Sequence, residues 1–337
     1  MGHVSNEPAP TPVPTPRSAG AATVLARSRV DLATALAESP DPRAVVMTMG
    51  ALHEGHFDLV REAARRVGPA GTVVVTIFVN PLQFAPTEDL DAYPRDLEGD
   101  LAGLARTLTG ADGTLGVGRL IVFAPTPEVI YPAGQPAVRI DPGPIATVLE
   151  GRTRPTHFAG VCQVVLTLMH LTAPRWALFG RKDAQQLAII ESMVRDLAVP
   201  LEIVPVDIRR ENDGLAMSSR NAYLSPEQRQ QALALSRALQ AGRDAAAQAT
   251  GSHPDPAAIR RAALASLEAA DGVEIDYVAL VAPDSFEDLA GAGLGLPRSE
   301  PAGEDEGEGL PAVGLLAVAA RVGTTRLIDN TLIDLRP

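Results

Sequence analysis

Short apolar runs alternate with segments of helical periodicity along the first two thirds of this 337-residue chain. Residues 44–49 form the first such run, which ends at Gly50, and apolar residues then recur three or four positions apart from Phe57 to Val67. Strands that alternate with helices pair in parallel, and the helices then cover both faces of the sheet. We therefore predict a Rossmann-like α/β fold, in which ligands bind at the carboxyl ends of the strands.

The chain divides near residue 208, where this alternation stops. Before that point, further strands are predicted at residues 72–79, 120–123, 176–179 and 201–206, and helices at residues 96–108, 158–171 and 184–197. After it come two alanine-rich helices at residues 226–248 and 256–270, and apolar strands at residues 273–281, 314–322 and 326–333. We expect a Rossmann-like domain over residues 21–208 and a smaller C-terminal α+β domain, acting as a lid, over residues 209–337.

Three segments have the composition of surface chain. Residues 1–20 contain five prolines and lack the basic and apolar parts of a signal peptide, so they predict a disordered tail. Acidic residues among glycines and prolines predict a flexible loop at about residues 298–311, and glycines predict another loop at residues 109–118. No apolar run approaches the roughly 20 residues that span a bilayer, so we expect a cytoplasmic protein without a membrane partner.

Charge and cysteine content exclude other classes of protein. The formal net charge is −12, whereas nucleic acid is bound by clustered positive charge, so we expect no nucleic-acid partner. The single cysteine, Cys162, rules out an intramolecular disulfide and a cysteine-rich zinc site, and we interpret it as a core thiol. Of the 29 basic residues, all but Lys182 are arginine. This lysine reflects either codon bias or a site that needs a compact ammonium group.

The first polar cluster, residues 49–56, follows the strand at residues 44–49 and contains two histidines, His53 and His56. Two histidines on a turn that leads into a helix, with Gly55 allowing close approach of the backbone, indicate a polyphosphate site at the free N–H groups of the helix. A zinc pair and simple turn residues are the alternatives. Zinc is disfavoured because only two residues separate the histidines and the helix has not yet formed.

Two further clusters follow strands or lie at the domain junction. Residues 179–186 end a strand and contain Lys182, whose ammonium can neutralise charge on phosphoryl oxygens in a transition state. In the same cluster, Gln186 offers a neutral amide to a hydroxyl or a carboxylate. Residues 214–221 form a predicted loop with two serines and Arg220, which are available to phosphates.

Together, and in this order, the three clusters resemble the pantothenate synthetase family of the nucleotidyltransferase superfamily. The resemblance extends from about residue 44 to residue 229, includes residues 78–84, 93–95 and 154–161, and returns at residues 324–330. It implies an ATP-dependent ligase that joins (R)-pantoate to β-alanine through a pantoyl adenylate and releases AMP and pyrophosphate. It also implies Mg²⁺ alongside ATP and a homodimer.

The resemblance implies roles for individual residues as well. The residues expected to act in catalysis, by compensating charge on the leaving pyrophosphate, are His53, His56, Lys182, Ser218, Ser219 and Arg220, with His56 as the candidate acid. The residues expected to contact ATP are Met49, Gly50, Ala51, Leu52, His53, Glu54, Gly55, His56, Gly180, Arg181, Lys182, Asp183, Arg209, Met217, Ser218, Ser219 and Arg220. Those expected to hold pantoate are Gln83, Gln186 and Arg154. Asp100 is the one candidate for organising the metal ion, but residues 99–100 offer one acid where the family often has two adjacent acids, so a solvated acid at a helix start is the favoured interpretation.

Two other functions are alternatives for such a chain. A different nucleotidyltransferase, such as a phosphopantetheine or nicotinate-mononucleotide adenylyltransferase, would use the histidine motif to adenylylate a phosphate. Gln83 and Gln186 argue against it, because a phosphate acceptor needs more basic side chains than two neutral amides. A non-catalytic nucleotide-binding protein would not need the complete set of charged groups that this chain contains.

Overall fold

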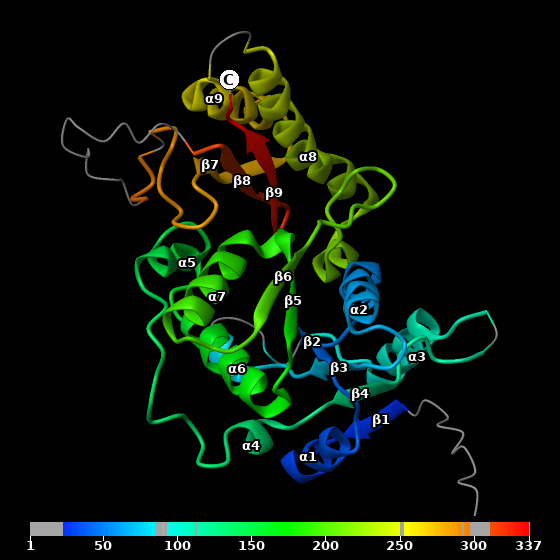
Figure 1. The fold of residues 1–337 in the computed structure, drawn as a ribbon. Helices are drawn as coiled ribbons and strands as arrows, with labels where there is room; N and C mark the ends of the chain where they lie inside the picture. Colours follow the sequence, from blue (N-terminus) through cyan, green and yellow to red (C-terminus); the bar gives the residue numbers. More distant parts are fainter. Residues whose placement is uncertain are drawn as a thin grey trace, which may run out of the picture.

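The structure, a computed structural model, describes residues 23–84, 90, 93–111, 113–249, 253–291, 293–296 and 311–336. These residues form a six-stranded parallel sheet of order β1-β4-β3-β2-β5-β6 and a three-stranded antiparallel sheet of order β7-β8-β9 (Figure 1). The predicted Rossmann-like parallel sheet and the smaller C-terminal α+β unit are confirmed. The predicted proline-rich tail and all but the last residue of the predicted acidic loop lie outside the described residues.

The parallel sheet has apolar residues on both of its faces. Its strands are β1 (Thr23–Ala26), β2 (Arg43–Thr48), β3 (Thr72–Ile77), β4 (Arg119–Phe123), β5 (Trp176–Gly180) and β6 (Glu202–Val206). Val45 packs into the core on one side of the sheet and Val46 into the core on the other. Such continuous apolar runs are typical of strands that helices cover on both sides. The runs predict every strand except β1, which has four residues and lies at the sheet edge.

Helices cover both faces of this sheet. On one face lie α1 (Arg29–Ala37), α4 (Pro127–Ile130), α6 (His157–Thr172) and α7 (Ala184–Asp196). On the other lie α2 (Glu54–Val67) and α3 (Leu97–Leu108). The apolar stripe of α2 decides its orientation, because Phe57, Val60 and Ala63 are buried against the sheet.

The strand order reverses between β2 and β5. The chain places β3 and β4 on one side of β2, and β5 and β6 on the other, so that Val45 of β2 pairs with Ala177 of β5. Parallel α/β folds bind ligands in the crevice at such a switch point, beyond the carboxyl ends of the two strands. The turns after β2 and β5 contain the first and second polar clusters, so the fold brings these clusters together.

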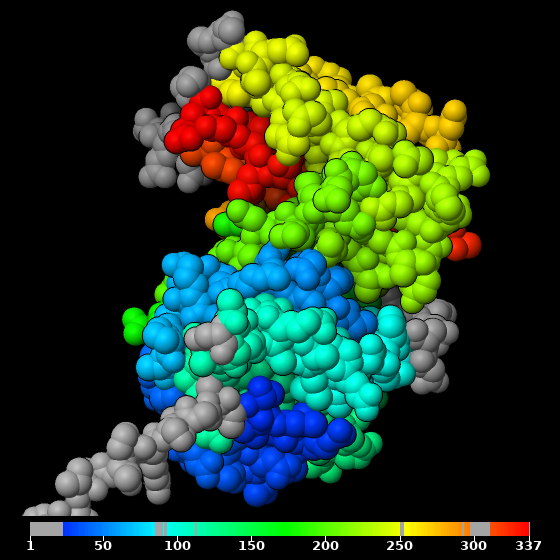
Figure 2. All heavy atoms as spheres, turned by 90° about the vertical axis from the view of Figure 1, so that its right-hand side faces the viewer, coloured from blue at the N-terminus to red at the C-terminus, as the bar shows by residue number. Residues whose placement is uncertain are grey.

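The antiparallel sheet is covered by helices on one face and by the parallel-sheet unit on the other. It consists of β7 (Val273–Val281), β8 (Val313–Val322) and β9 (Thr325–Asp334), and its helices are α8 (Pro226–Ala247) and α9 (Pro256–Glu268). On the other face, Tyr277 and Ala317 form one buried cluster with Val148 and Ala188. Figure 2 shows this C-terminal part, yellow to red, stacked on the N-terminal part, blue to cyan.

A partly buried network of charges also joins the two units. Arg326 of β9 lies 2.6 Å from Glu150 of α5 (Glu150–Thr153) and 2.7 Å from Asp276 of β7. Tyr277 Oη donates to Glu150 at 2.9 Å. Burial alone lowers the pKa of Arg326, but hydrogen bonds to the two carboxylates outweigh burial and raise the pKa. Removing one partner of this network leaves a partly desolvated charge without its counter-charge, so the network opposes separation of the two units.

Short 3₁₀ helices complete the fold. They are η1 (Pro81–Gln83), η2 (Pro144–Thr147), η3 (Arg181–Asp183) and η4 (Ser219–Tyr223). In the segment at residues 109–118, predicted as a surface loop, Thr109 and Leu115 form a β-bridge, and Val117 is buried. Of the helices that the structure describes, none is long and apolar enough to cross a bilayer.

The packing of α6 on η1 predicts the effect of one substitution. A Cβ on Gly160 would clash with Leu82 O and lie 2.6 Å from Gln83 N. Backbone atoms cannot move aside as the tip of a side chain can, so Gly160→Ala is expected to lower the free energy of unfolding by about 1–3 kcal/mol, measured by urea denaturation. In the control Gly180→Ala, the added Cβ meets nothing within 4 Å. Equal stabilities of the two variants would contradict this packing.

Candidate functional site

The turn after β2 is anchored by a buried carboxylate. Gly50 (φ +89°) and Ala51 (φ +51°) reverse the chain in left-handed backbone conformations. The N–H groups of Ala51 and Leu52 donate to the two carboxylate oxygens of Asp100 in α3, at 3.1 and 2.7 Å. Burial raises the pKa of Asp100, and the two N–H groups partly oppose this by favouring the carboxylate. Asp100 therefore fixes the turn that leads to the histidines.

His53 and His56 cap the N-terminus of α2 and each uses the same ring nitrogen. His53 Nδ1 accepts a hydrogen bond from Gly55 N at 3.2 Å, and His56 Nδ1 accepts one from His53 N at 3.2 Å. The two ring centroids are 4.0 Å apart. Because Nδ1 is the acceptor in each ring, the neutral ring carries its proton on Nε2. Each histidine thus keeps an N–H donor for a ligand.

Burial holds both rings neutral. Burial is the largest cause that lowers the pKa of His56 from 6.5 to about 3, and the neighbouring His53 and Lys182 contribute to the same shift, while Asp183 opposes it. The pKa of His53 is also lowered, first by burial and then by Lys182. Neutral imidazoles next to a helix N-terminus donate N–H groups without bringing two buried like charges together, an arrangement that suits an anionic ligand.

Lys182 lies in η3, directly after β5. Its side chain is 19% exposed, and Nζ is 3.7 Å from Asp183 Oδ1. Since β5 is the neighbour of β2, this turn and the histidine turn leave the sheet side by side. From this position the Lys182 ammonium lowers the pKa of both His53 and His56.

The third cluster reaches the crevice because residues 209–217 fold back on themselves. Met217 N donates to Arg209 O at 2.9 Å, which closes this turn. Met217 Sδ then lies 3.3 Å from Gly55 N at the start of α2. The contact joins the third cluster to the first and places Ser218, the next residue, beside the histidines.

Gln83 and Arg154 lie at another part of the same crevice. Gln83 in η1 is 7% exposed, its Nε2 donates to Met49 Sδ at 2.8 Å, and its Oε1 accepts from Asn80 at 3.3 Å. His157 Nδ1 lies 3.1 Å from Gln83 O, and Arg154 Nη1 lies 3.1 Å from His157 Nε2. Through its backbone oxygen, Gln83 is thus held next to His157 and the Arg154 guanidinium.

The three clusters and Gln83 surround one cavity of about 270 Å³. The predicted site residues on its wall are Met49, His53, Gly55, His56, Gln83, Arg154, Gly180, Lys182, Asp183, Gln186, Arg209, Met217, Ser218, Ser219 and Arg220. A second cavity, of about 340 Å³, adjoins it between the two units and shares Lys182, Gln186 and Arg220 with it. The cavities together cover the crevice at the switch point and the junction with the C-terminal sheet.

Six predicted residues lie off the wall of the 270 Å³ cavity: Gly50, Ala51, Leu52, Glu54, Asp100 and Arg181. Glu54 pairs with Arg61 at 2.9 Å, and Arg181 pairs with Asp207 at 3.3 Å. The prediction of Asp100 as a solvated acid is wrong, because it is 3% exposed and both its oxygens accept from the backbone.

Among the wall residues that sequence analysis missed are Phe84, Tyr93, His157 and Asp207. The first three fall in segments that resemble the family, so those segments contained a signal for them. Asp207 follows β6 and belongs to no motif. Arg209, which was predicted, is held by an ion pair with Asp58 at 3.2 Å.

Within the described residues, no group of three or more histidine, cysteine, aspartate or glutamate side chains is arranged to hold a metal ion. Zinc bound by protein alone needs such a group. Cys162 is buried in α6, which confirms the interpretation of a core thiol.

Comparison with known proteins finds similar sequences along nearly the whole chain. The sequence model of the family described as pantoate-beta-alanine ligase matches residues 25–332. A pantothenate synthetase of Nocardioides sp. is 50% identical over 315 residues, which cover 92% of this chain and 85% of that protein. A pantothenate synthetase of Anaeromyxobacter dehalogenans is 48% identical over 305 residues, which cover 88% of this chain and 93% of that protein.

Solved structures agree with these sequence matches. The pantothenate synthetase of Thermus thermophilus superposes with a TM-score of 0.77 at 40% identity, covering 93% of this chain and all of that one. The pantoate-beta-alanine ligase of Francisella tularensis, solved in complex with beta-gamma ATP and beta-alanine, superposes with a TM-score of 0.65 at 28% identity, covering 92% and 98%.

The low pKa of His56 predicts a fold that loses stability in acid. The pKa is about 3 in the folded chain and returns to 6.5 on unfolding, so the unfolded chain binds more protons between these values. The stability due to the neutral ring is complete above pH 6.5 and is lost as the pH falls towards 3. At about pH 5 the loss is on the order of 2 kcal/mol.

Urea unfolding of the parent chain and of His56→Gln, at about pH 7.5 and about pH 5, measures this contribution. The variant lacks the titrating group, so it should lose less stability than the parent between the two conditions. Equal losses would contradict a buried neutral His56.

Proposed function

The chain belongs to the pantoate–β-alanine ligase family, and on that premise we propose that pantoyl adenylate forms in the cavity at the switch point. The protein is an ATP-dependent ligase that joins pantoate to β-alanine and releases AMP and pyrophosphate. First, a carboxylate oxygen of pantoate attacks the α-phosphorus of ATP, and pyrophosphate leaves. Then the β-alanine amine attacks the carbonyl carbon of the anhydride and loses a proton, and AMP leaves.

The assignment of residues rests on one observation: three chain segments line the same cavity. The turn after β2, the turn after β5 and the loop at residues 217–220 all line it. We assign the triphosphate to the start of α2, where N–H groups of the helix and the Nε2–H groups of His53 and His56 can donate hydrogen bonds to phosphate oxygens. We assign ATP contact to those residues that were predicted to contact ATP and that line the cavity. The other residues of that predicted set, Gly50, Ala51, Leu52, Glu54 and Arg181, support the turns in which the wall residues lie.

Positive charge is needed where pyrophosphate departs. Phosphoryl transfer spreads charge over the phosphoryl oxygens, and preorganised donors in a water-poor site stabilise that charge most effectively. Lys182 and Arg220 supply cations, while Ser218 and Ser219 supply hydroxyl donors. His56 donates from a neutral ring, because its low pKa keeps it uncharged at physiological pH.

Pantoate is assigned to the part of the cavity next to Gln83. The amides of Gln83 and Gln186 suit its hydroxyls and carboxylate, and Arg154 supplies one cation. The apolar lining there comprises Phe78, Val161, Val164, Val165 and Leu168, which matches the dimethyl-substituted carbon of pantoate. A phosphate acceptor would find amides and apolar side chains where it needs several cations, which argues against a different adenylyltransferase.

β-Alanine, the amine substrate, is assigned to the cavity that adjoins the proposed adenylate site. The Francisella tularensis relative, which has the same fold, was solved with beta-gamma ATP and beta-alanine bound. The adjoining 340 Å³ cavity shares Lys182 and Gln186 with the proposed adenylate site. This arrangement leaves room for a second small substrate beside the acyl group.

Mg²⁺ is proposed to enter bound to ATP. It is usually held by one or two carboxylates together with phosphate oxygens and water, and the cavity wall offers Asp183, whose side chain is 52% exposed. Asp100 does not fit this role, because its oxygens accept from Ala51 and Leu52. When bound, Mg²⁺ neutralises charge on the phosphates.

Three further properties are proposed from the family and the sequence. The protein acts in the cytoplasm, it forms a homodimer, and residues 209–337 form a lid domain on an ATP- and pantoate-binding domain of residues 21–208. Support for a lid comes from the 340 Å³ cavity, which is lined by Lys182 and Gln186 from the first domain and by Arg220 and Asn330 from the second.

The proposed order of steps predicts which substrates each half-reaction needs. With ATP and labelled pyrophosphate, label should exchange into ATP only when pantoate is present, because pyrophosphate leaves in the first step. Multiple-turnover release of AMP should need β-alanine in addition. Exchange without any carboxylate, or exchange driven by a phosphorylated acceptor in place of pantoate, would overturn the proposal.

The role of Lys182 predicts a large effect on the first half-reaction. Lys182→Ala is expected to slow single-turnover formation of the adenylate by two orders of magnitude or more, about 3 kcal/mol, as for loss of one preorganised donor. Rapid-quench measurement of acid-stable products gives this rate. Arg195→Ala, which removes an exposed cation paired with Asp196 in α7, serves as the control. A Lys182→Ala rate equal to the control rate would rule out this role.

A further inference from the structure

Two consecutive residues of β9, Asp329 and Asn330, bind one of the three segments that carry the proposed catalytic groups and the start of the loop that leads to another. Asn330 binds the turn with Lys182, and Asp329 binds Arg210, which precedes Ser218 in the chain. We infer that Asp329 and Asn330 are positioning residues for adenylation, which hold the backbone of Lys182 and the loop that leads to Ser218. This inference rests on the function proposed for Lys182 and Ser218. Neither β9 residue needs to touch the reacting atoms.

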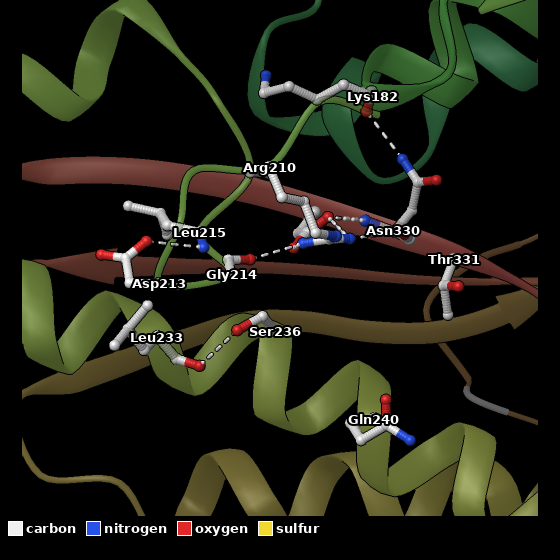
Figure 3. A network of polar contacts seen from close by, with 12 residues as sticks. Lys182, Arg210, Asp213, Gly214, Leu215, Leu233, Ser236, Gln240, Asn330 and Thr331 are labelled. Atoms are coloured by element: carbon white, nitrogen blue, oxygen red, sulfur yellow. Dashed lines mark hydrogen bonds and ion pairs between the residues drawn. The ribbon is translucent and has the colours of Figure 1, made fainter. Parts of the chain in front are cut away.

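Asn330 holds the turn of the lysine through its side-chain amide. Its Nδ2 donates to Lys182 O at 2.8 Å and to Arg181 O at 2.9 Å, so both amide hydrogens have acceptors in η3. Asn330 is 6% exposed, and water is therefore a poor substitute for these bonds. Figure 3 shows the amide reaching from β9 to the carbonyl of Lys182. The only lysine of the chain is thus tied to the C-terminal sheet.

Asp329 holds the third cluster through Arg210. Arg210 Nη1 and Nη2 donate to the two oxygens of Asp329 at 2.7 and 3.0 Å, and Nη1 also donates to Gly214 O at 3.1 Å. The side chain of Asp329 is 2% exposed. Arg210 also forms a β-bridge with Ala216 in the turn that ends at Met217. A paired, planar contact of this kind restricts direction as well as distance.

The two contacts are linked within β9. Asp329 Oδ1 accepts a hydrogen bond from Asn330 N at 2.8 Å, which couples the aspartate to the backbone of its neighbour. Asn330 extends towards the parallel-sheet unit, whereas Asp329 meets Arg210. Lys182 and Ser218 are 36 positions apart and belong to no common strand. The backbone of Lys182 is bound by Asn330, and the loop that leads to Ser218 is bound by Asp329 through Arg210. A displacement of catalytic groups by about 1 Å can slow a reaction by on the order of 100-fold. Contacts that fix Lys182 and the loop before Ser218 to the same strand are therefore expected to affect the rate of adenylation.

The test compares two adjacent residues of the same strand. Asn330→Ala removes both bonds to η3, while Thr331→Ala, the control, removes one bond to Arg243 of α8, at 2.9 Å. Lys182 is the only lysine, so protein labelled with [ε-¹³C]lysine gives a single lysine side-chain signal. Asn330→Ala is expected to shift or broaden that signal and to slow pantoate-dependent ATP–pyrophosphate exchange by on the order of 10- to 100-fold. In Thr331→Ala the signal should stay in place, and the exchange rate should stay within about twofold.

Asn330→Asp and Arg210→Lys extend the test. The first keeps the side-chain size but cannot donate to two carbonyls, so it should slow exchange at least as much as Asn330→Ala, and it replaces that variant if Asn330→Ala does not fold. The second keeps the charge but loses the paired contact with Asp329. It should slow exchange while leaving the lysine signal closer to that of the parent, because Asn330 still holds η3.

Asn330→Asp or Asn330→Ala with the lysine signal and exchange rate of the Thr331→Ala control would overturn the inference. A parent protein that shows no pantoate-dependent exchange would instead refute the proposed function. In that case, the lysine signal alone still decides whether Asn330 positions Lys182.

Discussion

The pairing of β2 with β5 is the constraint on which the site depends. These two strands are distant in sequence but adjacent inside the parallel sheet, where the strand order reverses. Two polar turns therefore follow their carboxyl ends and lie next to each other, one with His53 and His56 and one with Lys182. The resulting site combines neutral N–H donors with a cation, and both occur where a sheet of this kind leaves an open crevice. Asp100, buried in α3, then gives the histidine turn its shape by binding two of its N–H groups.

The C-terminal sheet supplies what the parallel sheet alone lacks. Apolar packing brings it against the parallel-sheet unit, and the partly buried pairing of Arg326 with Glu150 opposes displacement. From this position β9 reaches both Lys182 and the loop before Ser218. The sheet that covers the cavity is in this view also part of the framework that orients the reacting groups, because a site needs supporting contacts around its catalytic residues.

Much of the fold could be predicted from the sequence, because buried parallel strands leave long apolar runs and amphipathic helices leave a period of three to four residues. β1 escaped prediction because four residues at a sheet edge carry little of this signal. The three polar clusters could be recognised because each follows a strand or a domain junction. The partners of these clusters could not, since Glu150 and Arg326 are 176 positions apart and no local pattern links them. The role of Asp100 could not be predicted either. Its partners are backbone N–H groups, which every residue except proline has, so the sequence does not mark them.

The central claim is that the histidine turn, the lysine turn and the loop at residues 217–220 form one adenylation site. A crystal structure of the protein after soaking with ATP and pantoate tests it most directly. The account predicts density for pantoyl adenylate, with the phosphate beside His53, His56 and Lys182, and the pantoyl group between the amides of Gln83 and Gln186. Density for the nucleotide in a different part of the molecule, or with pantoate bound away from these amides, would contradict it.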